Sequence, residues 1–132
     1  MNDMELRFCD AVKIMQVDIS RNAIAHGFYD DEQKRYFECG PDGDFVQVDL
    51  SNYFKGNRIA LQHSELSEGL EGIRKPHPDQ HCPEFTNVEI ELADTVIRIL
   101  DMAEFYKLRV IEAIIAKHNF NKSRPYKHGK AF

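Results

Sequence analysis

The sequence lacks long apolar runs and closely spaced cysteine pairs. Its 132 residues include only three cysteines, Cys9, Cys39 and Cys82, an odd number with wide spacing. This pattern argues against a disulfide framework and for reduced thiols. No apolar run approaches the roughly 18 residues that a membrane-spanning helix needs, and the first ten residues lack the basic-then-apolar pattern of a signal peptide. We therefore expect a cytoplasmic protein without a membrane partner.

Common catalytic and metal-binding motifs are also missing. The sequence contains no glycine-rich phosphate loop, no G-x-S-x-G and no H-E-x-x-H. His77, His81 and Cys82 lie close together in the chain, but no fourth ligand stands at a spacing typical of zinc sites. The chemistry of the chain must therefore come from other residues.

The charge is distributed unevenly along the chain. The formal net charge is −5, yet residues 117–132 contain five Lys or Arg residues and no acid. An acidic body with a basic tail fits a metal-dependent site for a phosphorylated ligand at least as well as it fits nucleic-acid binding. The negative net charge, and the lack of aromatic residues among the basic ones beyond Tyr126, disfavour a nucleic-acid partner.

The length suits one domain, residues 1–132, and the apolar periodicity predicts an all-α fold, a four-helix bundle. The predicted helices span residues 3–25, from 51 or 57 to 73, 87–106 and 108–121. The turn signal GPDG predicts a small β-hairpin insertion over residues 36–48. The apolar positions expected in the core are Phe8, Val12, Met15, Ile19, Ala23, Ile59, Leu66, Leu70, Ile73, Val110, Ile111, Ile114 and Ile115.

The third predicted helix is apolar around most of its circumference. Its polar residues Glu91, Asp94, Arg98 and Asp101 fall at i, i+3, i+7 and i+10, which places them in one narrow stripe. Acidic side chains on a buried helix need a partner. Three other helices of so short a chain cannot cover the apolar surface, so we expect at least a dimer.

Two pairs of acidic residues share one spacing. Glu65 and Glu68 are three residues apart, as are Glu91 and Asp94, so each pair lies on one helix face. On neighbouring antiparallel helices the four carboxylates could converge, where they would raise one another's pKa unless a cation were bound. Ligands that are all oxygen favour Mg²⁺, with Mn²⁺ as a substitute. The alternative interpretation is two ordinary solvated acidic faces.

Three segments in order add a resemblance to a known family. They are ELSE (65–68), ELADTVIRILD (91–101) and KHNFNKSRPYKHGK (117–130). From about residue 61 onward the chain resembles the MazG-type all-α nucleoside triphosphate pyrophosphohydrolases. The resemblance implies that Glu65, Glu68, Glu91 and Asp94 chelate Mg²⁺. It also implies hydrolysis of (deoxy)nucleoside triphosphates to the monophosphate and pyrophosphate, for house-cleaning or pool control, by a dimer or a dimer of dimers.

Further roles follow from the resemblance. Ser64 stands where some relatives have a second Glu that activates water, so the catalytic base is expected to be Glu65, unless activation by the metal suffices. Asp101 is expected beside the metal ligands without contacting the ion. The expected phosphate-binding residues are Lys117, Asn121, Arg124 and Lys127. Their alternative role is a basic helix end that complements the helix dipole.

The end of the first helix offers candidates for binding the base. Phe28 could stack on it, and Asn22 or His26 could hydrogen-bond to it. The alternative is ordinary packing at the end of a helix. The hairpin insertion is expected near this base pocket. Because of Ser64, the alternative function is a non-catalytic regulatory protein that binds nucleotide or metal on the same fold.

Overall fold

The computed structural model describes residues 1–125, which form four helices and one β-hairpin. The elements in chain order are α1 (Asp3–Ala25), β1 (Tyr36–Cys39), β2 (Phe45–Val48), α2 (Ser51–Arg74), α3 (Asn87–Phe105) and α4 (Val110–Lys122). The prediction of a mostly helical chain with a small hairpin insertion is confirmed. Within residues 1–125, no helix has both the length and the apolarity needed to cross a membrane.

Local sequence signals fix the ends of two helices. At the start of α1, the Asn2 side chain accepts a hydrogen bond from the Glu5 backbone N–H (2.9 Å), and the Glu5 carboxylate accepts one from the Asn2 N–H (2.8 Å). Thr86 and Glu89 form the same reciprocal capping box at the start of α3. Gly27, with a φ of 77°, ends α1 in a left-handed conformation that favours glycine.

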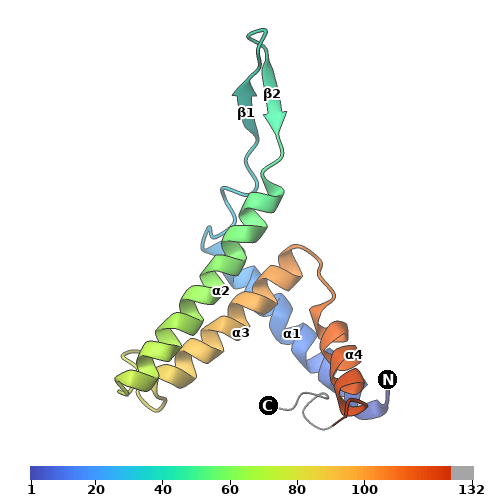
Figure 1. Cartoon of the computed structure of the whole chain (residues 1–132), viewed down its shortest axis with the longest axis vertical. Coiled ribbons are helices and arrows are strands. Elements are labelled where there is room, and N and C mark those ends of the chain that lie inside the picture. Colours follow the sequence, from blue (N-terminus) through green and yellow to red (C-terminus); the bar gives the residue numbers. More distant parts are fainter. Residues whose placement is uncertain (126–132) are drawn as a thin grey trace.

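The helices form a splayed arrangement (Figure 1). α2 and α3 lie antiparallel side by side, and a loop closed by a β-bridge between Pro78 and Thr86 joins them. α1 crosses α3, and α4 packs against α1 far from that loop. The principal contacts among the described helices are therefore pairwise, α2 with α3, α3 with α1, and α1 with α4, and they do not close into a bundle.

The face that α1 buries differs from the predicted one. Cys9, Gln16 and Ser20 are its buried residues, whereas Phe8 is 43% exposed and Met15 is 56% exposed. The predicted helix is correct and its predicted apolar stripe is only partly so. The helix is rotated so that a mixed polar face meets α3 and α4. The apolar residues beside that face stay open in a single chain.

The contact between α1 and α4 follows the prediction more closely. Cys9 packs with Ile111 and Ile115, and Val12 is half-buried against them. Ile114 is 46% exposed, so its predicted burial is wrong in one chain. It lies three positions from Ile111 and one from Ile115, at the edge of the buried face.

The face of α2 against α3 carries small residues instead of the predicted apolar ones. Glu65, Gly69 and Gly72 are its buried residues, one above another at i, i+4 and i+7. The predicted core residues Ile59, Leu66, Leu70 and Ile73 are 44–65% exposed. The glycines explain this correction, because without side chains they allow the backbone of α3 to come close, and closeness of the backbones decides which face is covered.

Gly72→Ala tests this close approach. A Cβ at this position would lie 2.8 Å from Asn87 Nδ2 and 3.0 Å from a Val88 methyl. We expect a loss of about 1–3 kcal/mol in the free energy of unfolding, as is usual for an overpacked contact. Gly56→Ala is the matched control, because a Cβ added there would meet no atom within 4 Å. The control should gain up to about 1 kcal/mol from helix propensity, and equal gains in both variants would show that the helices are not tightly apposed.

The β-hairpin extends from the start of α2 away from the helices (Figure 1). Its strands pair antiparallel, with Tyr36 opposite Val48 and Cys39 opposite Phe45. Phe45 is 77% exposed and Phe37 is 55% exposed. The hairpin is therefore an insertion outside the core, as predicted.

Candidate metal centre

Three of the four predicted metal ligands meet between α2 and α3. One carboxylate oxygen from each of Glu65, Glu91 and Asp94 lies within 4.8 Å of the others. Glu65 is only 7% exposed, although it is charged. A Cβ added to Gly69, one turn after Glu65, would lie 3.4 Å from the Cβ of Glu91. The close approach of the helices is thus what brings the two acid pairs together.

The electrostatics of this group are unfavourable without a cation. Burial raises the pKa of Glu91, and the charges of Glu68 and Glu65 raise it further. Burial also raises the pKa of Asp94, with Glu65 again adding to the shift. Arg98 partly compensates, since its Nε donates a hydrogen bond to Glu65 at 2.5 Å. One guanidinium leaves an excess of negative charge, which a divalent cation would remove.

Glu68 stands apart from the other three acids. It is exposed, and the Ser64 hydroxyl donates a weak hydrogen bond to it at 3.4 Å. Its charge nevertheless raises the pKa of both Glu91 and Asp94, so it is close enough to contribute to the field of the site. Ser64 and Glu68 therefore flank the three converging carboxylates.

The donor set fits a hard divalent ion. Mg²⁺ binds oxygen at roughly 2.1 Å, so opposite ligands of one ion lie about 4.2 Å apart. The three carboxylate oxygens lie within 4.8 Å of one another, which is close to that spacing. Glu65, Glu91 and Asp94 would hold the ion, and Glu68 is near enough to assist. Elsewhere in residues 1–125 no other cluster of potential ligands is found, and His77, His81 and Cys82 do not form one.

A cavity of about 370 Å³ opens beside the acids, between α1, α2 and α3. Asp94 belongs to both the acid group and the cavity wall. Asn22 and Phe28, which the sequence predicted as base-binding, also line it. His26 does not, because its exposed ring contacts the Asn22 carbonyl oxygen at 2.8 Å instead. No residue of the hairpin lines this cavity. The prediction that the hairpin lies near the base pocket therefore does not hold in a single chain.

The cavity wall also contains groups that the sequence did not indicate as functional. Arg58 of α2 forms a salt bridge with Glu32 at 2.7 Å and places its guanidinium 3.8 Å from the ring centre of Tyr29. Tyr29 is completely buried and stacks on Phe105 with ring centres 3.7 Å apart. The segment between α1 and the hairpin is thereby fixed to α2. No local pattern signals this pairing, since Arg58 and Glu32 are 26 residues apart.

Asp101 lies at the back of this cavity. It is 7% exposed, and the buried hydroxyls of Tyr29 and Ser20 are the hydrogen-bond donors nearest to its carboxylate. Asp101 does not belong to the converging group of Glu65, Glu91 and Asp94, and its role beside a metal ion stays a prediction. Burial raises the pKa of Asp101, while the nearby Tyr29 hydroxyl and Arg58 charge oppose the shift.

The predicted phosphate-binding residues lie elsewhere in a single chain. Lys117 and Arg124 have their charged ends 4.8 Å and 5.9 Å from the ring centre of Phe120, and Asn121 is exposed. None of the three lines the cavity beside the acids. Lys127 lies outside the described residues. The position of α4 explains the separation, because a turn at Lys107, with a φ of 54°, directs α4 back along α1.

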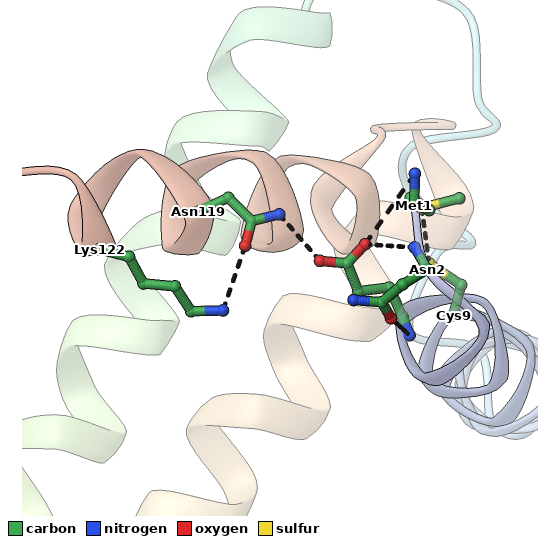
Figure 2. Close-up of polar contacts among 6 residues, drawn as sticks. Met1, Asn2, Cys9, Asn119 and Lys122 are labelled. Atoms are coloured by element: carbon green, nitrogen blue, oxygen red, sulfur yellow. Dashed lines mark hydrogen bonds and ion pairs between the residues drawn. The ribbon is translucent and has the colours of Figure 1, made fainter.

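Polar contacts hold α4 in that position (Figure 2). Asn119 donates a hydrogen bond to Glu5 at 2.9 Å, and Lys122 donates one to Asn119 at 3.3 Å. On the other side of Glu5, its carboxylate accepts from the Asn2 N–H. These contacts explain why the end of α4 lies with the start of α1 rather than with the acids.

Comparisons of the chain with protein-family models, with curated proteins and with solved structures gave no match.

Proposed function

We propose that the protein is a Mg²⁺-dependent nucleoside triphosphate pyrophosphohydrolase that serves nucleotide pool control or house-cleaning. The supporting observation is the convergence of Glu65, Glu91 and Asp94 beside a cavity that also contains Asn22 and Phe28. The acids supply a site for a hard cation, and the cavity lies within the roughly 300–1,000 Å³ range of small-molecule sites. The sequence resemblance to MazG-type enzymes joins these two features into one activity.

In the proposed reaction, water is added across one phosphoanhydride bond. The water oxygen bonds to the α-phosphorus, and the bond from that phosphorus to the oxygen bridging the β-phosphorus breaks. Pyrophosphate leaves with the electron pair of the broken bond. Bound Mg²⁺ would act as a Lewis acid that stabilises charge on the phosphate oxygens.

Glu65 is the proposed general base, because Ser64 stands where some MazG-type relatives have the Glu that activates water. Its carboxylate accepts the water proton, and its hydrogen bond from Arg98 fixes the orientation of the side chain. Asp94 and Glu91 hold the cation from α3. Lys117, Asn121, Arg124 and Lys127 are proposed to meet the triphosphate in an assembly of two or more chains, in which surfaces that are distant in one chain can meet.

A dimer or a dimer of dimers is part of this proposal. Exposed large apolar side chains outnumber buried ones among residues 1–125. On α3, Leu92 is 51% exposed and Val96 is 54% exposed, which leaves an apolar strip open to a second copy. A symmetric interface would cover this strip on both subunits at once.

Light scattering at micromolar concentration tests the assembly. We expect a mass of at least twice the 15.4 kDa of one chain. Val96→Glu should lower that mass by placing a charge in the covered strip. Phe45→Glu on the exposed hairpin is the control and should leave the mass unchanged. A wild-type mass of 15.4 kDa would refute the assembly.

A non-catalytic regulatory protein is the second candidate function. It is favoured by the ion pair between Arg98 and Glu65, which engages the proposed base, and by the serine at position 64. Such a protein would bind nucleotide with Mg²⁺ and release no pyrophosphate. Turnover is thus the property that separates the two candidates.

A panel of ribo- and deoxyribonucleoside triphosphates tests the proposed function. Pyrophosphate release is measured with Mg²⁺, with Mn²⁺ and with a chelator. We expect release with either ion and none with the chelator. Nucleotide binding without release under all conditions would favour the regulatory protein, and neither binding nor release would exclude both.

A further inference from the structure

Phe28 combines an exposed aromatic side chain with a firmly held backbone. The residue lies in the turn after α1, its side chain is 63% exposed, and it lines the cavity beside the acids. Its backbone N–H donates a hydrogen bond to the Ala23 carbonyl oxygen at 3.1 Å, and its own carbonyl oxygen accepts one from Arg58 Nη2. Both backbone polar groups of Phe28 are therefore engaged, although the residue belongs to no helix or strand.

The arginine that holds Phe28 is itself fixed by two other residues. Its Nε donates to Glu32 at 2.8 Å, and its guanidinium lies 3.8 Å from the ring centre of Tyr29. The hydroxyl of Tyr106, the residue after α3, donates a second hydrogen bond to Glu32. The side chain of Arg58 is only 11% exposed and that of Glu32 only 7%. The hydrogen bond to Phe28 thus comes from a group with little freedom to move.

Stability alone does not account for this buried ion pair. Taking two charges out of water costs free energy that their attraction often only balances, and apolar residues of similar volume are often equally stable. A planar guanidinium adds direction, because its N–H groups can donate to a carboxylate and to a carbonyl oxygen at once. Glu65 follows Arg58 by seven residues, on the same face of α2. Arg58 therefore fixes the place of Phe28 relative to the helix that carries the buried acid of the metal centre.

These contacts do not favour Arg58 as a direct ligand of phosphate. Its Nη2 atom lies 2.7 Å from a carboxylate oxygen of Glu32, so its charge is already neutralised. A phosphate oxygen would have to compete with that carboxylate and with the Phe28 carbonyl oxygen. The guanidinium is engaged in holding the turn.

We propose that Arg58 is a positioning residue for the nucleobase, which holds Phe28 so that its ring forms a stacking surface in the cavity before the ligand arrives. A ring that is already in place avoids the entropy cost of ordering it on binding. Arg58 thereby strengthens binding of the base without touching the ligand. This inference rests on the proposed function, because it assumes that the base of a nucleotide enters the cavity.

A double-mutant cycle between Arg58 and Phe28 tests this role. Calorimetry with Mg²⁺ measures the Kd of a non-hydrolysable deoxynucleoside triphosphate and of inorganic triphosphate, which has no base. Phe28→Ala should weaken nucleotide binding about tenfold, the scale of one base–aromatic stack. Arg58→Lys keeps the charge but cannot reproduce the planar contact with both acceptors. It should weaken nucleotide binding about threefold or more, the scale of coupling between residues in contact, and should cause no further loss in the Phe28→Ala background.

Two controls separate positioning from a general effect on the fold. Inorganic triphosphate should bind wild type and Arg58→Lys equally, since it has no base to stack. Arg74→Lys makes the same change at an exposed position of α2 and should keep the wild-type affinity for both ligands. If Arg58→Lys does not fold, Glu32→Gln takes its place in the cycle, because it removes the charge that holds the guanidinium while keeping an acceptor. The same dependence on Phe28 is then expected.

The outcomes separate the positioning role from the proposed function. Wild type that binds neither ligand contradicts the proposed function, and the positioning role falls with it. Unchanged nucleotide affinity in Arg58→Lys, or the same loss with and without the Phe28 ring, overturns the positioning role and leaves the function standing. Weaker binding of inorganic triphosphate by Arg58→Lys would assign Arg58 to the phosphates and also overturn it. A loss of nucleotide affinity that requires the Phe28 ring supports the proposal.

Discussion

Glu91→Gln and Asp94→Asn are each expected to lower Mg²⁺-dependent pyrophosphate release at least ~100-fold. A loss of about 100-fold is the upper end of what removing a residue that only supports a metal ligand costs. Both residues converge with Glu65 on one small volume, so either change removes a ligand from the site. Neither change should unfold the protein. The metal-free variants should be as stable as wild type or more so, because each removes one charge from a group of mutually repelling acids.

The pH dependence of stability gives this prediction a second readout. Burial and neighbouring carboxylates raise the pKa of Glu91 above its ordinary value of 4.5. The folded protein therefore holds this proton more tightly than the unfolded chain does, and ionisation destabilises the fold as pH rises through the folded-state pKa. The metal-free Glu91→Gln variant should therefore be more thermally stable than metal-free wild type at the pH values at which Glu91 of folded wild type is ionised. Below about pH 4.5 the difference should vanish.

Addition of Mg²⁺ should reverse the order. We expect wild type to bind the ion only in its folded state, so its melting temperature should rise with Mg²⁺ concentration. Glu91→Gln and Asp94→Asn should show little response. Glu84→Gln, an exposed change in the loop before α3, serves as the control and should behave as wild type does. Full turnover in both ligand variants would contradict the metal site.

Arg124→Ala is expected to weaken binding of a non-hydrolysable triphosphate by ~1.5–3 kcal/mol, the range for hydrogen bonds to charged groups. The bound ion can neutralise only part of the negative charge of the triphosphate, and a guanidinium can hold the remaining oxygens in a two-pronged contact. Arg124→Lys should recover part of the loss, since an ammonium cannot reproduce that geometry. Binding of Mg²⁺ alone should be unchanged.

The position of α4 in one chain does not bring Arg124 to the acids. In one chain Arg124 lies against Phe120, and α4 packs along α1 rather than beside the acids. The contact with phosphate must therefore arise in an assembly or through movement of α4. Calorimetry on wild type, Arg124→Ala and the exposed control Arg35→Ala measures it. Equal affinity in all three would show that the basic residues of α4 serve its packing and helix dipole instead.

The secondary structure could be predicted because its signals are local. Asn2 and Thr86 cap the helices that follow them, and Gly27 ends the first one. The four helices and the hairpin accordingly lie close to their predicted ranges. The buried faces could not be predicted as well. Periodicity identifies apolar stripes, but Gly69 and Gly72 let α3 approach a different face of α2.

The candidate site, too, could be predicted only in part from the sequence. The spacing on two helices, together with the family resemblance, predicted that four acids converge; Glu65, Glu91 and Asp94 do so, whereas Glu68 stands apart. The contacts of Arg58 with Glu32 and Tyr29 join distant segments, and no local pattern indicates them. The location of Lys117 and Arg124 depends on where α4 packs, which is a property of the tertiary fold.

The position of bond cleavage tests the central claim most directly. Hydrolysis of a triphosphate with Mg²⁺ in water enriched in oxygen-18 marks the phosphorus that water attacks. Mass spectrometry of the products then locates the label. Attack at the α-phosphorus places it in the nucleoside monophosphate and leaves the pyrophosphate unlabelled, which is the result we predict. Label in pyrophosphate, or the absence of both products, would contradict a metal-assisted attack on the α-phosphorus at Glu65, Glu91 and Asp94.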